Sequence, residues 1–105
     1  MKRFEVYLVD LDPTKGRELK KTRPCVVVSP DAMNQKDWVV IVAPLTSTKR
    51  SYPTRVPCEF QGKQGDVALE YIRSVDCDRL IKKVGELSAK EASQVASRLQ
   101  ELFAL

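Results

Sequence analysis

Residues 4–29 read FEVYLVDLDPTKGRELKKTRPCVVVS, and this stretch decides the fold because two apolar runs enclose one polar segment. The first run, residues 4–11, is rich in residues that favour β-strands. Asp12-Pro13 ends it, because proline has no N–H to donate to a sheet. The second run, residues 24–29, holds an unbroken Cys-Val-Val-Val core, which is typical of a strand buried on both faces. Both runs therefore predict β-strands.

The strand pattern continues toward the middle of the chain. Residues 38–43 predict a third strand that Pro44 closes. Residues 55–60 alternate, so we expect a half-buried strand with its even-numbered residues in the core and its odd-numbered residues, from Arg55 on, in solvent. Residues 61–66 predict a turn, and residues 67–75 predict one or two short strands.

The C-terminal third predicts helices. Asp76 is placed to cap a short helix with Leu80 and Ile81 as its apolar contacts, and Gly85 would break it. Ser88 and Glu91 match a capping box, which opens a longer helix. The apolar residues behind this box recur at helical spacing: Ala92, Val95, Ala96, Leu99, Leu102 and Phe103.

Five or six short strands and one C-terminal helix make this a mainly β domain, and such domains often close into a small barrel. With 105 residues, we expect one domain spanning residues 1–105, since two would each be too small to bury a core. No apolar run approaches the roughly 20 residues that span a bilayer. Glu5 and Asp10 interrupt any signal-peptide core, so we expect a cytoplasmic protein without a membrane partner.

Composition excludes several kinds of chemistry. The chain has no histidine, which excludes His-based triads, paired-His nucleases and most zinc enzymes. Its three cysteines are odd in number and widely spaced, so we expect reduced thiols, neither a disulfide framework nor a zinc site. Cys25 and Cys58 lie in strand-like runs, where we expect small buried hydrophobes. We expect no metal and no cofactor.

Positive charge is concentrated in two short segments. Residues 14–23 hold five bases and one acid, and residues 48–55 add three bases, which gives the two segments a net charge of +7. The whole chain carries only +4, so everything else sums to −3. This concentration indicates a surface that binds a polyanion.

Six short motifs follow one another along the chain: DPTKGRE at residues 12–18, TRP at 22–24, PLTS at 44–47, YPTRV at 52–56, VAL at 67–69 and IRSVD at 72–76. In this order they resemble the MazF/PemK family of toxins, and the resemblance spans nearly the whole chain. It departs from the family pattern at Phe4, where glycine is usual, at the more basic residues 19–21, and at Tyr71, where glutamine is common.

The resemblance implies an SH3-like barrel of the MazF/PemK/CcdB type that forms a homodimer. It also implies a metal-independent endoribonuclease that cuts single-stranded RNA and so inhibits translation and growth. A cognate antitoxin would neutralise it, and we expect a small protein with a DNA-binding domain and an acidic disordered tail.

By the same resemblance, Arg23 and Thr46 stand at the family's essential arginine and threonine, and Glu18 stands at the glutamate of its Gly-x-Glu element. Guanidinium stays charged and can donate two hydrogen bonds to a phosphate, so Arg23 suits the stabilisation of a transition state. Thr46 can donate to a phosphate oxygen. Glu18 is the only carboxylate in the first basic segment and the natural general base.

Several of the candidate catalytic and RNA-contacting residues also have a plainer interpretation. Arg23 is alternatively a solvated residue at a strand start, Thr46 a turn residue, and Glu18 a counter-charge. Arg73 would sooner pair with Glu70 or Asp76. Trp38 and Phe60 would sooner pack in the core than stack on bases. The expected RNA-binding residues are Lys15, Arg17, Lys20, Lys21, Ser47, Lys49, Arg50, Tyr71 and Arg73.

Two other functions compete with a nuclease. A branch of the same fold poisons DNA gyrase, but it depends on a C-terminal tail containing tryptophan, and the only tryptophan here is Trp38. A non-catalytic RNA-binding module is the other, because phosphate contacts give affinity without any chemistry.

Overall fold

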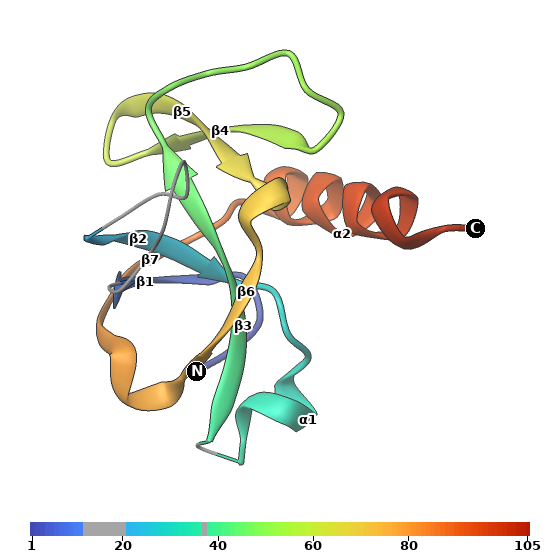
Figure 1. The fold of residues 1–105 in the computed structure, drawn as a ribbon. Coiled ribbons are helices and arrows are strands. Elements are labelled where there is room, and N and C mark those ends of the chain that lie inside the picture. The colour runs from blue at the N-terminus through green and yellow to red at the C-terminus, as the bar shows by residue number, and fades with distance from the viewer. Residues whose placement is uncertain (12–20, 37) are drawn as a thin grey trace.

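A computed structural model describes residues 1–11, 21–36 and 38–105. The part it describes is mainly β (Figure 1). Two short 3-10 turns, Leu69–Tyr71 and Cys77–Arg79, flank β6. The strands are β1 (Glu5–Asp10), β2 (Thr22–Val27), β3 (Val39–Thr46), β4 (Arg55–Phe60), β5 (Lys63–Ala68), β6 (Arg73–Asp76) and β7 (Leu80–Glu86), and the helices are α1 (Asp31–Asn34) and α2 (Ala89–Phe103).

The strands form one strongly curled antiparallel sheet in the order β4-β5-β3-β2-β1-β7, with β6 paired to β3. β3 belongs to both parts of this curled sheet. Its residues 39–44 pair with β6 and β2, and its last two residues, Leu45 and Thr46, pair with β5. The sheet therefore bends around β3 into a half-barrel, and α2 packs across β4 at one side (Figure 1). The prediction of a mainly β, barrel-like domain with a C-terminal helix is confirmed.

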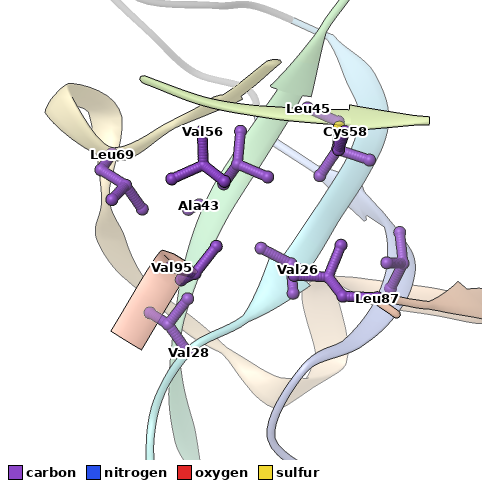
Figure 2. Packing of buried hydrophobic residues seen from close by; sticks show 11 residues of the cluster. Val26, Val28, Ala43, Leu45, Val56, Cys58, Leu69, Leu87 and Val95 are labelled. Atoms are coloured by element: carbon purple, nitrogen blue, oxygen red, sulfur yellow. The ribbon is translucent and has the colours of Figure 1, made fainter. Parts of the chain in front are cut away.

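β2 is buried on both of its faces, as its unbroken apolar run predicts. Val26 belongs to a core cluster between the curled sheet and α2, which also includes Val95 (Figure 2). Cys25 and Val27 belong to a second cluster on the opposite face. Cys25 and Cys58 are buried free thiols, as expected. Burial raises the pKa of Cys58 to about 11, so this thiol stays protonated at neutral pH.

Two of the strand boundaries differ from expectation. β3 does not end at Pro44 but continues through Thr46, because Pro44 lies where the strand leaves β2 for β5 and a missing N–H is tolerated there. The turn predicted over residues 61–66 is only Gln61-Gly62, both with positive φ, and β5 begins at Lys63. The polar residues at the start of β5 are exposed, which hid the strand.

The region after β6 was predicted wrongly. Asp76 precedes a 3-10 turn, but its side chain makes no cap hydrogen bond. Leu80 and Ile81 begin strand β7, which pairs with β1. Gly85 lies within β7 and breaks nothing. A Cβ at this position would lie 2.9 Å from Cε1 of Phe60, so a larger residue there would force the Phe60 ring to shift.

The C-terminal helix begins as predicted. The Ser88 hydroxyl accepts a hydrogen bond from the Glu91 backbone N–H at 3.1 Å, and the Ser88 N–H donates to the Glu91 carboxylate at 3.0 Å. Val95 is fully buried, but the predicted apolar stripe is uncovered at its end, where Phe103 is 69% exposed. No helix in the described part of the chain is long and apolar enough to cross a membrane.

Two aromatic residues need separate comment. Trp38 precedes β3 and is 74% exposed, so the prediction that it packs in the core is wrong, whereas Phe60 does pack against the core. Phe4, which stands where the resembling family has glycine, adopts a φ of 72°. Glycine enters this region at the lowest cost. Here two backbone hydrogen bonds hold Phe4, from its N–H to the Val27 carbonyl and from the Leu87 N–H to its own carbonyl.

Candidate functional site

The start of β2, the end of β3 and the β4–β5 hairpin enclose an open groove of about 350 Å³. The β2–β3 ladder brings Arg23 and Thr46 to the same groove. Its last pair is Cys25 with Pro44, and Arg23 and Thr46 each lie two residues beyond that pair, where β3 passes from β2 to β5. The groove is lined by Arg23, Pro24, Leu45, Thr46, Ser47, Cys58, Phe60, Gln61, Lys63, Gln64 and Gly65.

Arg23 is half-buried, and its Nε is fully buried without a hydrogen-bond partner among the described residues. A buried donor left unpaired costs about 1–3 kcal/mol. Arg23 and Arg73 are both close enough to Cys25 for their charges to favour the ionised form of its thiol. Burial outweighs their effect and raises the pKa of Cys25 to about 12. Arg23 therefore brings a positive charge to the groove lining, together with a buried donor that no described residue uses.

Thr46 is 9% exposed, and its hydroxyl oxygen accepts a hydrogen bond from the Thr48 backbone N–H at 3.1 Å. An oxygen that accepts from the chain keeps its own proton for another acceptor. β5 runs very close to this residue. A Cβ at Gly65 would lie 2.5 Å from the Thr46 carbonyl oxygen, so only glycine fits here. The sequence analysis placed Gly65 in a turn and missed this contact.

The second basic segment is held by two acids, the buried Asp66 and the more exposed Glu70. Arg55 is 8% exposed and donates to the carboxylates of Glu70 at 2.7 Å and Asp66 at 3.2 Å. The expectation that Arg55 faces solvent is therefore wrong. Lys49 forms an ion pair with Asp66 at 3.0 Å, and the Arg50 backbone N–H donates to the same carboxylate at 2.9 Å. Two of the three bases in this segment thus have their charges balanced within the protein.

These contacts set the protonation of Asp66. Burial opposes its ionisation, but hydrogen bonds from the Arg50 N–H, Lys49 and Arg55 outweigh burial and lower the pKa of this carboxyl. Hydrogen bonds to the two carboxylates likewise raise the pKa of Arg55 against the effect of its burial. The pair is therefore ionised at neutral pH.

The remaining predicted site residues are placed as follows. Ser47 lines the groove, Arg50 is exposed nearby, and Tyr71 is half-buried in the turn before β6. Arg73 donates to the Leu11 carbonyl at 3.1 Å, and within the described residues Glu70 forms its ion pair with Arg55. Lys21 is exposed with a φ of 68°. Lys15, Arg17, Glu18 and Lys20 lie outside the described residues.

The β4–β5 hairpin adds groove residues that the sequence analysis did not select. Phe60 and Lys63 are paired across the hairpin and share one face. Lys63 is exposed and forms no ion pair within the described part of the chain. The alternation of residues 55–60 predicted the face of Phe60 but said nothing of Lys63. Over the same described residues, no three His, Cys, Asp or Glu side chains gather as a metal site would require.

Comparison with known proteins gives one consistent family. Residues 2–103 match the family described as PemK-like, MazF-like toxin of type II toxin-antitoxin system. The chain is 37% identical to endoribonuclease MazF9 of Mycobacterium tuberculosis, over 95% of this chain and 93% of that protein.

Solved structures agree with this family. MazF from Deinococcus radiodurans has a TM-score of 0.85 at 26% identity, covering 100% of this chain and 97% of that one. An endoribonuclease solved in complex with its cognate antitoxin, from a mycobacterial species, has a TM-score of 0.84 at 25% identity, covering 100% and 96%.

Proposed function

The chain belongs to the family of PemK-like, MazF-like toxins of type II toxin–antitoxin systems, and we propose that it is an endoribonuclease that cuts single-stranded RNA at specific sequences. The observation that carries this proposal is the meeting of Arg23 and Thr46 at one groove, with an unused buried donor on Arg23. The relative named endoribonuclease MazF9 supports it. Cutting messenger RNA would stop translation and growth, which would be the toxic effect. Ribosomal and transfer RNA are further candidate targets.

The reaction needs no external nucleophile, because RNA carries its own. The 2′-hydroxyl oxygen attacks the adjacent phosphorus, the bond from phosphorus to the 5′ oxygen breaks, and a 2′,3′-cyclic phosphate and a 5′-hydroxyl result. The 2′ proton leaves to a base, for which Glu18 is our candidate, and the departing 5′ oxygen gains a proton. No step of this sequence calls for a metal ion.

Arg23 and Thr46 would act on the phosphate. Two guanidinium donors can hold its non-bridging oxygens and offset the charge that builds up in the transition state. The Thr46 hydroxyl donates to one of the same oxygens, because its own oxygen already accepts from Thr48. Arginine stays protonated at neutral pH, so Arg23 stabilises charge and does not act as the base.

The cations around the groove would hold the RNA strand. Lys63 reaches it from the β4–β5 hairpin, where it pairs with Phe60 at the groove lining. Arg50 reaches it from the next loop. The first basic segment would supply Lys15, Arg17, Lys20 and Lys21, with Arg73 and Tyr71 beyond it.

We also propose the assembly that the family implies. A homodimer would carry the groove, and a cognate antitoxin would block it. The mycobacterial endoribonuclease solved in complex with its cognate antitoxin supports an antitoxin partner. An acidic segment of the antitoxin would compete with RNA for the same cations. The working compartment would be the cytoplasm, where both RNA and a co-expressed antitoxin are available.

The test is a pair of matched oligonucleotides. The purified protein, with EDTA present, is incubated with total RNA, and the new 5′ ends are mapped to find the cut sequence. An oligonucleotide with that sequence should be cut to a cyclic phosphate, and the same oligonucleotide with one 2′-deoxy sugar at the cut site should stay intact. Cleavage of the deoxy substrate would overturn the mechanism. RNA binding without new ends would identify a non-catalytic RNA-binding module instead.

A further inference from the structure

We infer that Asp66 and Arg55 position the hydroxyl of Thr46 through a chain of hydrogen bonds that runs across residues 47–54. This inference rests on the proposed function, because Thr46 is the group being positioned. Asp66 and Arg55 are not groove-lining residues, so they would act on the reaction only through Thr46.

The chain of contacts has three links. The carboxylate of Asp66 accepts from Nη1 of Arg55 at 3.2 Å. The same Nη1 donates to the Thr48 carbonyl at 2.8 Å. The Thr48 backbone N–H then donates to the hydroxyl oxygen of Thr46 at 3.1 Å. A fixed carboxylate thus reaches the candidate catalytic hydroxyl through one guanidinium and one residue of backbone.

Asp66, at one end of this series of hydrogen bonds, is held in place by two strands and by the loop. Asp66 is 1% exposed and lies in β5, where it is paired directly with Thr46 of β3 and with Pro57 of β4. Its two oxygens accept from Lys49, from the Arg50 N–H and from Arg55. A buried charge is tolerated only with such partners. Asp66 is therefore held by two strands on one side and by the loop on the other.

Residues 47–54 themselves have little else to hold them. They form no strand, and residues 47–53 are all exposed. Besides the contacts to Asp66 and Arg55, this loop is fixed by Lys49, whose Nζ donates to the Gly65 carbonyl at 3.2 Å, and by Thr54, whose hydroxyl donates to Glu70 at 2.9 Å and whose carbonyl accepts from the Leu69 N–H. Without Asp66 the backbone at Thr48 would sample more conformations, and its N–H would no longer fix the Thr46 hydroxyl.

The hydrogen bond from Thr48 sets the direction in which the Thr46 hydroxyl can donate its proton. When the Thr48 N–H occupies one lone pair of the Thr46 oxygen, the Thr46 proton is directed to an acceptor outside the loop. The acceptor on offer is a phosphate oxygen of bound RNA. Pre-ordering this donor raises the rate of the chemical step more than the affinity for substrate, because the donor is most useful when charge develops.

The test is a double-mutant cycle between Asp66→Asn and Thr46→Ala, measured as single-turnover cleavage at saturating enzyme. Asparagine keeps the shape of the side chain but loses its charge. We expect Asp66→Asn to slow cleavage roughly 10–100-fold, the scale of a small misplacement of a reacting group. Its affinity for the uncleavable 2′-deoxy oligonucleotide should stay that of the wild type. In the Thr46→Ala background, Asp66→Asn should slow cleavage no further.

One control variant and one substitute variant accompany this test. Glu5→Gln removes another ion pair, the one with Lys83 at 2.8 Å between β1 and β7, and should leave the rate unchanged. If Asp66→Asn does not fold, Arg55→Lys replaces it, because lysine keeps the charge but cannot reach Asp66, Glu70 and the Thr48 carbonyl together.

The outcomes separate the two claims. Wild-type activity in Thr46→Ala would overturn the role of Thr46 in the proposed function. An inactive Thr46→Ala with an unimpaired Asp66→Asn would overturn this inference alone. Equal losses from Asp66→Asn in both backgrounds would also overturn it, since a purely structural effect does not depend on the Thr46 hydroxyl.

Discussion

Arg23 and Arg55 are both set into the barrel near the groove, and they use their guanidinium groups in opposite ways. Arg55 donates to Glu70, Asp66 and the Thr48 carbonyl. Arg23 has a buried Nε with no partner among the described residues. The donors of Arg55 are paired within the protein, whereas the Nε donor of Arg23 is one that the described residues leave unpaired.

The difference shows that the number of positive charges is a poor guide to where a polyanion binds. Lys49 and Arg55 contribute to the basic character of residues 48–55, yet Asp66 and Glu70 balance them. A cation that is already paired inside the protein contributes little to an external phosphate. Unmatched donors near a groove are the better criterion, and they select Arg23 and Lys63.

The largest effect should come from breaking the matched arginine. Arg55→Ala leaves the buried carboxylate of Asp66 with Lys49 as its one remaining ion-pair partner among the described residues and removes the ion-pair partner of Glu70, and breaking a buried pair typically costs about 3–5 kcal/mol. Urea unfolding followed by circular dichroism measures this loss. Arg23→Ala, which removes an unpaired donor, should unfold at nearly the wild-type midpoint. A small loss for Arg55→Ala would mean that the buried network is not what holds residues 47–54.

The unmatched arginine should show the reverse pattern. Arg23→Ala should slow RNA cleavage roughly 100–1,000-fold, the usual effect of removing a donor that stabilises transition-state charge. Arg23→Lys keeps the charge but loses the two-donor geometry, so it should recover only part of the rate. Single-turnover kinetics on the mapped oligonucleotide measure both variants. Full activity in Arg23→Ala would remove this residue from the site.

The sequence predicted the elements whose signals are local. The apolar run around Val26 predicted a strand buried on both faces, and the Ser88–Glu91 pair predicted where α2 begins. The sequence did not predict β7 or the start of β5. The polar residues of these strands face solvent, and each strand contains a glycine that packs closely against a residue distant in the chain. Gly65 makes room for Thr46, and Gly85 makes room for Phe60.

The site was only partly predictable. Arg23 and Thr46 came from the resemblance of short motifs, and the strand register then explains why residues so far apart in the chain meet. The structural role of Arg55 was hidden, because its partner Asp66 lies across the hairpin and had been assigned to a turn. Composition reports how many charges a segment holds, and only the fold reports which of them are paired.

Lys63 provides a smaller test of the same distinction. Lys63 lines the groove and forms no ion pair with the described residues, so it should bind one RNA phosphate. Lys63→Ala should therefore weaken binding of the 2′-deoxy oligonucleotide. The slope of log affinity against log salt should fall by about 0.7, the contribution of one contact to a single strand. Lys36→Ala is the matched control, because Lys36 lies in sequence between α1 and the start of β3, whereas the groove lies at the end of β3. Figure 1 shows α1 at the end of β3 away from the β4–β5 hairpin. Equal slopes for Lys63→Ala and the wild type would exclude the contact.

The smallest effect should appear in acid. Because hydrogen bonds lower the pKa of Asp66 in the folded protein, this group stabilises the fold above the pKa of an unfolded Asp, about 3.9, and the contribution is lost as the pH falls through the lower folded value. Urea midpoints measured from pH 6 downward should therefore fall less steeply for Asp66→Asn than for the wild type. Arg23→Ala should keep the wild-type slope, since Arg23 has no part in holding Asp66. If Arg23→Ala flattened the acid limb as Asp66→Asn does, the two arginines would share one network and the contrast between them would be wrong.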